Sequence, residues 1–181
     1  MVKENIEVEV RSFISRKKYN HLLKYFKKNG KFLGKDNQIT YYFSGPKDLR
    51  IQKTGKLSKL WLKSGKIHEK YRQDIVVRCN KEDFENLDKL LSGLGFKVKI
   101  KWFRKRNEFL WKGTRVCLDW TRGYGYIIEL EKMTTEKNKE KVYRDLLQKL
   151  RELNIKLTPK EIFDKKFSYY KNNWRKLIKP R

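Results

Sequence analysis

The chain has 181 residues, of which 38% are hydrophobic and 14% aromatic, so it can build a packed core and is not an intrinsically disordered chain. Lysine and arginine number 47 against 21 acidic residues, which gives a formal net charge of +26. The longest apolar runs are far shorter than the ~18 residues of a transmembrane helix, and the first twenty residues are charged throughout, which excludes the apolar core of a signal peptide. We therefore expect a cytoplasmic protein that does not enter a membrane.

The excess of positive charge leaves two interpretations open. It suits an anionic partner, such as a nucleotide, a polyphosphate, RNA or an acidic lipid surface, but a lysine-rich surface can also serve solubility alone. The two cysteines, Cys79 and Cys117, have neither CxxC spacing nor a histidine nearby in sequence. They are expected to be free thiols in a reducing compartment rather than ligands of a zinc ion.

Hydrophobic periodicity and turn residues predict a single domain over residues 1–181, with a basic helical segment at about 159–181. Ser15 is the expected N-cap of a first helix that ends at Asn29-Gly30, and Thr158 begins a capping-box pattern before a last helix with an aromatic stripe. That stripe predicts a helix packed across the sheet. Two further helices are expected near 81–94 and 140–153, and strands near 2–13, 39–44, 49–53, 59–63, 71–78, 97–109, 114–120 and 126–132.

Acidic side chains recur at every second position in two of the predicted strands. In IEVEVR, Glu7 and Glu9 share one strand face with Arg11, and in YIIELEK, Glu129 and Glu131 share another. RVCLDW adds a carboxylate at position 119 from a third strand. Basic side chains alternate in the same way in four other segments, where they form the sets Arg50 with Gln52, Lys59 with Trp61 and Lys63, Arg72 with Asp74, and Arg104 with Arg106.

Two explanations of these charged faces are available. An antiparallel sheet commonly has one solvated face, and charges belong there. However, both ExE pairs lie on strands rich in isoleucine and valine, and the predicted helices suffice to cover the outside of a closed sheet. The carboxylates would then crowd together inside a barrel and repel one another unless a divalent cation such as Mg²⁺ or Mn²⁺ offset their charge. The remaining arginines and lysines would suit phosphate oxygens, a combination typical of phosphoryl or nucleotidyl transfer.

The sequence resembles the CYTH superfamily, the triphosphate tunnel metalloenzymes, which include class IV adenylyl cyclases and thiamine triphosphatases. EVEVR matches the N-terminal ExExK signature, and RKRNEF, RVCLDW, GYG and YIIELE match the later pattern in order, so the resemblance covers about residues 4–170. Three positions depart from the pattern. Arg11 replaces the usual lysine, Gln52 replaces the second arginine of an RxR pair, and Asp74 stands where an R-x-E glutamate is common.

The resemblance implies an α+β fold, namely a closed eight-stranded antiparallel β-barrel (a tunnel) with helices packed outside. Such a tunnel would hold a triphosphate with Mg²⁺ or Mn²⁺. By position, the catalytic residues would be Glu7, Glu9, Glu129 and Glu131, and the metal would be held by these four together with Asp119. The triphosphate would be bound by Arg11, Arg50, Lys63, Arg72, Arg104 and Arg106. Asp74 is either a further metal ligand or part of a surface ion pair.

The expected function is metal-dependent hydrolysis of a nucleoside triphosphate, tripolyphosphate or 5′-triphosphate RNA, with water attacking the terminal phosphorus. A class IV adenylyl cyclase that converts ATP to cyclic AMP and pyrophosphate is the first alternative, since KLWLK-G at 59–65 also resembles that group. A non-catalytic RNA- or polyanion-binding module is the second. It would use the basic stretches 16–35, 97–106 and 165–181, which otherwise serve as solvated faces. The sequence leaves open whether the protein is a monomer or a homodimer.

Overall fold

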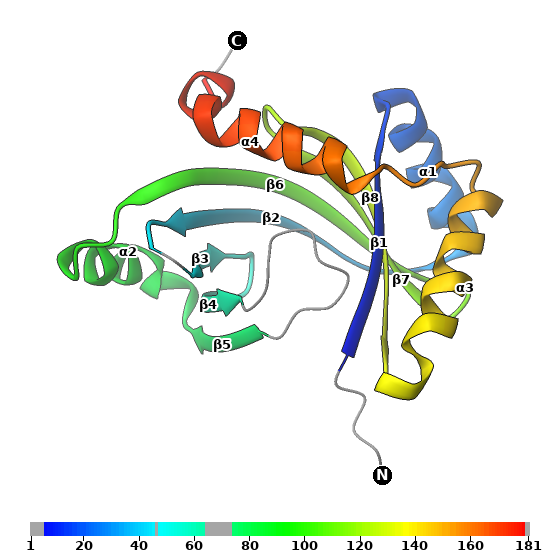
Figure 1. Ribbon diagram of the computed structural model, residues 1–181, viewed down its shortest axis with the longest axis horizontal. Coiled ribbons are helices and arrows are strands. Elements are labelled where there is room, and N and C mark those ends of the chain that lie inside the picture. The colour runs from blue at the N-terminus through cyan, green and yellow to red at the C-terminus, as the bar shows by residue number, and fades with distance from the viewer. Residues whose placement is uncertain (1–5, 46, 64–73, 180–181) are drawn as a thin grey trace.

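The computed structural model of the protein describes residues 6–45, 47–63 and 74–179, and for Lys63 and Asp74 it describes the backbone alone. Arg72, an expected phosphate ligand, therefore lies outside the described residues. Figure 1 shows the elements in chain order. They are β1 (Ile6–Ile14), α1 (Arg16–Asn29), β2 (Lys31–Phe43), β3 (Asp48–Lys53), β4 (Ser58–Lys63), β5 (Asp74–Cys79), α2 (Phe84–Gly93), β6 (Val98–Trp111), β7 (Thr114–Thr121), β8 (Gly125–Thr134), α3 (Lys139–Glu152) and α4 (Lys160–Leu177).

The strands form one antiparallel eight-stranded sheet in the order β1-β8-β7-β6-β2-β3-β4-β5. The sheet curves strongly, so that β1, β8 and β7 stand upright beside the stacked strands β2 to β5 (Figure 1). Closure into a barrel would require β1 to pair with β5. In the described residues β1 pairs with β8 and β5 with β4, and these two strands form the edges of the sheet. The expected α+β fold with an eight-stranded antiparallel sheet is confirmed, whereas its closure into a barrel is not.

Helices cover the outer face of the sheet because its side chains alternate between apolar and charged. Val8 and Val10 of β1 and Leu130 of β8 are buried against Leu146 and Leu150 of α3, in a core that α1 extends. A second core lies under α2, which packs on β3 and β4. In Figure 1, α1, α2 and α3 lie outside the strands. The opposite face of the same strands lines a groove, which α4 covers at one end.

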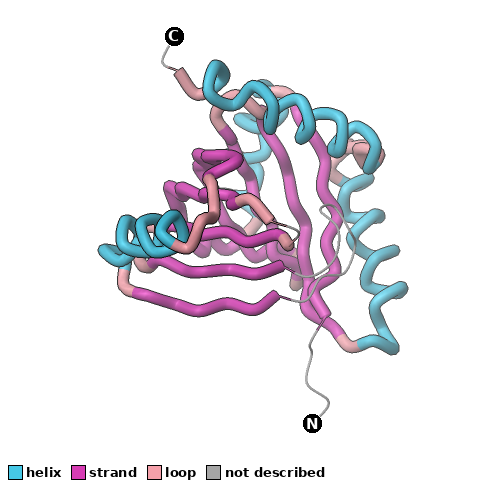
Figure 2. Tube along the Cα trace, turned by 60° about the vertical axis from the view of Figure 1, so that its left-hand side comes forward, coloured by secondary structure: helices cyan, strands magenta, loops and turns pink. Residues whose placement is uncertain are grey.

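The last helix, α4, packs on the inner face of the sheet at one end. Its residues Phe163, Tyr170 and Trp174 are buried against Ile100 and Tyr124, and the Tyr170 hydroxyl donates a hydrogen bond of 2.9 Å to the carbonyl oxygen of Lys101. The aromatic stripe expected from the sequence is therefore confirmed as a packing surface. It covers one end of the concave side of the sheet (Figures 1 and 2).

Two local predictions have different outcomes. The Ser15 hydroxyl accepts a hydrogen bond of 3.1 Å from the backbone N–H of Lys18, as expected for the N-cap of α1. The capping box at Thr158 is wrong, because its hydroxyl instead accepts a hydrogen bond of 3.0 Å from the backbone N–H of Phe13. This bond joins the segment before the last helix to β1. The side chain that the sequence assigned to a local cap therefore makes a tertiary contact instead.

Candidate functional site

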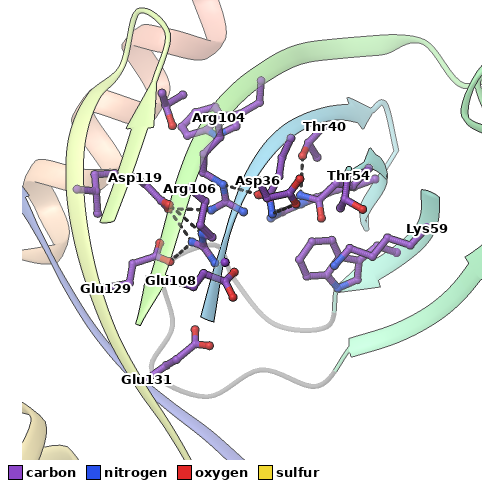
Figure 3. Close-up of a pocket in the computed structure, with 18 of the residues that line it drawn as sticks. Asp36, Thr40, Thr54, Lys59, Arg104, Arg106, Glu108, Asp119, Glu129 and Glu131 are labelled. Carbon is purple, nitrogen blue, oxygen red and sulfur yellow. Dashed lines mark hydrogen bonds and ion pairs between the residues drawn. The ribbon is translucent and has the colours of Figure 1, made fainter. Parts of the chain in front are cut away.

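The concave face of the sheet forms a groove with a volume of about 710 Å³. Its floor and walls come from the inward-facing residues of all eight strands, and Phe163 and Phe167 of α4 line one end. The inward set on β1 is Glu7, Glu9 and Arg11, as alternation predicted. Figure 3 shows part of this groove with acidic and basic side chains converging from β6, β7 and β8.

Three carboxylates gather where β1 lies beside β8. The register pairs Glu9 with Glu131, and oxygen atoms of Glu7, Glu9 and Glu131 all lie within 4.8 Å of one another. We call these three residues the acidic cluster. Burial of the Glu131 carboxyl and the charge of Glu7 raise its pKa to about 7, against the opposing effect of Arg115. Burial and the charge of Glu129 raise the pKa of Glu9 as well. The cluster therefore favours a proton or a cation.

A second group of charges lies deeper in the groove and is already neutralised. Arg106 donates to both oxygens of Asp119, from Nε to Oδ1 at 2.8 Å and from Nη2 to Oδ2 at 2.6 Å, and its Nη2 also bonds Glu129 Oε2. Arg104 Nη1 lies 3.2 Å from Asp119 Oδ2 (Figure 3). Burial alone would raise the pKa of Glu129, but the charges of Arg106 and Arg104 lower it to about 2. We call Arg104, Arg106, Asp119 and Glu129 the arginine network.

The five predicted metal-ligating residues therefore divide into two groups. Glu7, Glu9 and Glu131 come together as the acidic cluster, with Arg11 beside Glu9 and Arg115 beside Glu131, whereas Asp119 and Glu129 share Arg106. Arg104 and Arg106, two of the six residues expected to bind phosphate, contact the second group. The metal-binding role of Asp119 stays a prediction, and its observed contacts are those of a residue that orients guanidinium groups.

The remaining predicted phosphate ligands lie around the same groove. Arg11 pairs with Glu9 at 3.3 Å and stands 4.9 Å over the Phe163 ring. Arg50 forms an ion pair with Asp48 and lies 4.3 Å over the Tyr42 ring. The backbone of Lys63 places it at the end of β4, opposite Asp74 of β5. The structure therefore brings Arg11, Arg50, Arg104 and Arg106 to one cavity, while the Lys63 side chain and Arg72 lie outside the described residues.

Gln52, which departs from the family pattern, has a local explanation. Its Nε2 donates a hydrogen bond of 2.9 Å to the Thr40 hydroxyl across the buried β2–β3 pair. A neutral amide suits this position, because the side chain is 2% exposed and already has a hydrogen-bonding partner. The lost arginine leaves Arg50 as the guanidinium group that β3 contributes to the groove.

Sequence reasoning missed three residues of the site. Arg115 bridges Glu131 Oε1 at 2.7 Å and Glu108 Oε2 at 2.8 Å, and all three side chains line the groove. Cys117 is fully buried, with its sulfur within 4.8 Å of carboxylate oxygens of Glu129 and Glu131. The signal was present in the sequence, because Arg115 and Cys117 share the strand face of Asp119, and Glu108 shares that of Arg106. Burial raises the pKa of the Cys117 thiol, so this group stays protonated and uncharged.

The curved antiparallel sheet gathers carboxylates, which are oxygen ligands suited to a cation, and guanidinium groups, which are donors suited to an anion, on its concave face. Comparison with known families identifies the class of protein. Residues 5–161 match the CYTH domain family, so the chain belongs to this family, as the sequence motifs indicated. The resemblance to the CYTH superfamily that the sequence motifs indicated is therefore confirmed.

Several solved structures have the same fold. A conserved hypothetical protein from Pyrococcus furiosus is 23% identical, with a TM-score of 0.72 over 83% of this chain and 91% of its own. A candidate adenylate cyclase from Vibrio parahaemolyticus is 15% identical, with a TM-score of 0.68 over 90% of this chain and 99% of its own. A candidate adenylyl cyclase from Hippeastrum, described as having a dominant triphosphatase activity, is 20% identical, with a TM-score of 0.61 over 83% of this chain and 88% of its own.

No curated protein matches the chain in sequence. Among the helices that the structure describes, none is both long and apolar enough to cross a membrane.

Proposed function

We propose that the protein is a metal-dependent triphosphatase that binds the triphosphate group of its substrate in the groove. The observation that carries this proposal is the acidic cluster beside the arginine network within one cavity of about 710 Å³. Carboxylates that favour a cation and guanidinium groups that favour phosphate oxygens are the two parts that phosphoryl transfer needs. Membership of the CYTH family, which contains triphosphatases and adenylyl cyclases, supports the same conclusion.

The chemistry of the donor atoms fits a hard divalent cation. Glu7, Glu9 and Glu131 offer oxygen ligands, the kind that Mg²⁺ and Mn²⁺ prefer, and their oxygens lie within 4.8 Å of one another. These three residues would hold the cation. When bound, it would supply positive charge against the phosphate oxygens and the charge that develops during the reaction.

The protein's own residues would bind and orient the triphosphate. Arg104 has one donor group on Asp119 and another on Gln38, and Arg11 lies between the acidic cluster and Phe163. Both guanidinium groups line the groove with partial exposure and can turn donors toward phosphate oxygens. Arg106 is fixed by Asp119 and Glu129, which holds its positive charge in a set direction and preorganises the site.

A cyclase remains the second candidate because aromatic rings line the groove beside the arginines. Tyr42 and Trp61 both contact Arg50, and Trp102 lies at the end covered by α4. These rings offer flat apolar surfaces on which an adenine could stack. The solved structure from Vibrio parahaemolyticus that is described as a candidate adenylate cyclase favours the same alternative. In that case the ribose 3′-hydroxyl, rather than water, attacks the α-phosphorus.

Product analysis distinguishes the two candidates. The protein would be incubated with ATP, tripolyphosphate or 5′-triphosphate RNA, each with Mg²⁺ and with Mn²⁺, and the products separated by chromatography. A triphosphatase releases inorganic phosphate and a diphosphate product, whereas a cyclase releases cyclic AMP and pyrophosphate from ATP. The test variant is Glu9→Gln, which alters the acidic cluster, and its matched control is Glu82→Gln, which alters an exposed carboxylate outside the groove. Turnover that persists in Glu9→Gln and in EDTA would contradict both candidates.

A further inference from the structure

The outer face of the sheet carries a second charged surface, which the groove does not use. It lies over the end of β2, the first half of β6 and the end of β7. In Figure 1, α2 lies at one end of this part of the sheet, and α1 and α3 lie at the other. Lys105 and Arg122 are exposed on this surface, and the neighbouring side chains are half-buried. We call it the outer patch, and its residues are Tyr41, Lys101, Phe103, Lys105, Trp120 and Arg122.

The strand register makes the outer patch an alternation of rings and cations. Lys101 of β6 pairs with Tyr41 of β2, and its Nζ lies 4.3 Å from the centre of the tyrosine ring. Lys105 pairs with Trp120 of β7, with Nζ at 5.5 Å from the ring. The Arg122 guanidinium lies 5.6 Å from the Phe103 ring. Each cation thus sits beside an aromatic ring of the adjacent strand.

The charge of the outer patch is uniformly positive. Among the described residues, the outward-facing positions over 37–41 of β2, 101–105 of β6 and 118–122, at and just after the end of β7, include no aspartate or glutamate. Arg122 also donates, at 3.4 Å, to the carbonyl oxygen of Ile178, which brings the basic end of α4 to the edge of the patch. A second copy of a chain with a net charge of +26 would be repelled here, whereas a polyanion would be attracted.

We propose that the outer patch binds single-stranded nucleic acid. Its cations suit the phosphate backbone, and its half-exposed rings suit stacking with unpaired bases, the two features that single-strand binding surfaces combine. A β-sheet face is well suited to this role because its side chains project in register from adjacent strands. The rings favour nucleic acid over an inorganic polyanion, because an inorganic polyanion has no bases that could stack on them. The proposal is independent of the activity of the groove.

The test measures binding of a fluorescent oligonucleotide of about 12 nucleotides, within the usual site size of such surfaces, by fluorescence anisotropy. The oligonucleotide carries a 5′-hydroxyl group, so that it offers no triphosphate to the groove, and is used as RNA and as DNA. Because stacking of one base is typically worth a large factor in affinity, Trp120→Leu and Phe103→Leu should each weaken binding about tenfold. Leucine retains much of the apolar volume, and the melting temperature of each variant reports whether the fold is kept.

Charge variants and a competitor complete the test. The double variant Lys105→Ala with Arg122→Ala should weaken binding. It should also reduce the slope of log affinity against log salt concentration by about one for each cation removed. The matched control is Lys141→Ala with Arg144→Ala, which removes the same charge from the exposed face of α3 and should leave binding unchanged. Saturating tripolyphosphate with Mg²⁺ should not displace the oligonucleotide. Equal loss in both charge pairs, full binding by folded leucine variants, or complete displacement by tripolyphosphate would each overturn the proposal.

Discussion

Glu129 and Glu131 lie two residues apart on the same face of β8, and each is 8% exposed, yet the protein shifts their pKa values in opposite directions. Burial raises the pKa of Glu131 to about 7, and the charge of Glu7 adds to the effect. Burial acts on Glu129 too, but Arg106 and Arg104 outweigh it and lower that pKa to about 2. Both carboxylates pair with an arginine, but at Glu131 the charges of Glu7 and Glu129 oppose the effect of Arg115. The nearby charges, rather than the depth of burial, therefore set the direction of each pKa shift.

The largest effect is expected from removing the centre of the arginine network. Arg106→Ala would leave Asp119 and Glu129 buried without their main partner, which should lower the free energy of unfolding by about 3–5 kcal/mol. Arg104→Ala should cost less, because Arg104 makes a single, longer contact to Asp119 and is partly exposed. Urea denaturation of the two variants measures the difference. Equal small losses would mean that Arg106 does not hold the network together.

The acidic cluster should matter for turnover more than for folding. Glu9→Gln keeps the size of the side chain but removes an anionic oxygen ligand, and it should lower turnover of triphosphates by about a hundredfold or more, which is ~3 kcal/mol in the barrier. Rates measured with Mg²⁺ and with Mn²⁺ test this prediction, with Glu82→Gln as the control that keeps full activity. A Glu9→Gln enzyme that turns over at the normal rate would remove the cluster from the mechanism.

The opposite pKa shifts predict opposite dependences of stability on pH. The folded pKa of Glu131, about 7, lies above the unfolded value of 4.5, so the stability that its proton contributes is present below pH 4.5 and is lost as the pH rises through 7. The loss should approach about 3.5 kcal/mol, at roughly 1.4 kcal/mol per pKa unit, for protein without divalent cations. Glu131→Gln should flatten the profile of unfolding free energy between pH 5 and 8. If the unfolding free energy of Glu131→Gln and of the wild-type protein changed in parallel over this range, the assignment would be refuted.

Glu129 gives the reverse dependence in the same denaturation experiments. Its folded pKa of about 2 lies below the unfolded value of 4.5, so its stabilising effect is present above pH 4.5 and is lost as the pH falls toward 2. Glu129→Gln should therefore reduce the acid sensitivity of the fold between pH 5 and 2. If the variant and the wild-type protein lose stability in parallel over this range, the ion pair with Arg106 is not responsible.

The smallest expected effect concerns the aromatic side of the groove. Trp61 faces the cavity beside Lys59, whose Nζ lies 4.0 Å from its ring. Trp61→Ala should raise the Michaelis constant for ATP by about tenfold or less, in the range of one aromatic contact, and leave that for tripolyphosphate unchanged. Steady-state kinetics with both substrates measure the ratio. An equal change for tripolyphosphate would show that the ring supports the phosphate site instead.

The sequence predicted the residues of the groove better than their contacts. Alternation along each strand was enough to place Glu7, Glu9, Asp119, Glu129 and Glu131 on inward faces, because this pattern depends on one strand at a time. Which side chains meet depends on the register between strands, which no local pattern specifies. For that reason the division into an acidic cluster and an arginine network was not foreseen.

The same limit explains the errors in the fold. The sequence predicted strand 39–44, but β2 begins at Lys31, because pairing with β6 forms a strand across Gly34 with a local irregularity in register. Closure of the barrel was implied by the family resemblance, and the edge strands β1 and β5 do not confirm it. Elements with strong periodicity and local caps, such as α1, were predicted closely.

The central claim is that the acidic cluster is a binding site for a divalent cation, and titration with Mn²⁺ tests it most directly. Free Mn²⁺ would be followed by electron paramagnetic resonance at pH 8, above the pKa of Glu131, for the wild-type protein, Glu131→Gln and Glu82→Gln. The account predicts that the wild-type protein and Glu82→Gln bind Mn²⁺ equally and that Glu131→Gln binds at least about tenfold more weakly, as expected when an anionic ligand is lost. Equal affinity in all three proteins would contradict it.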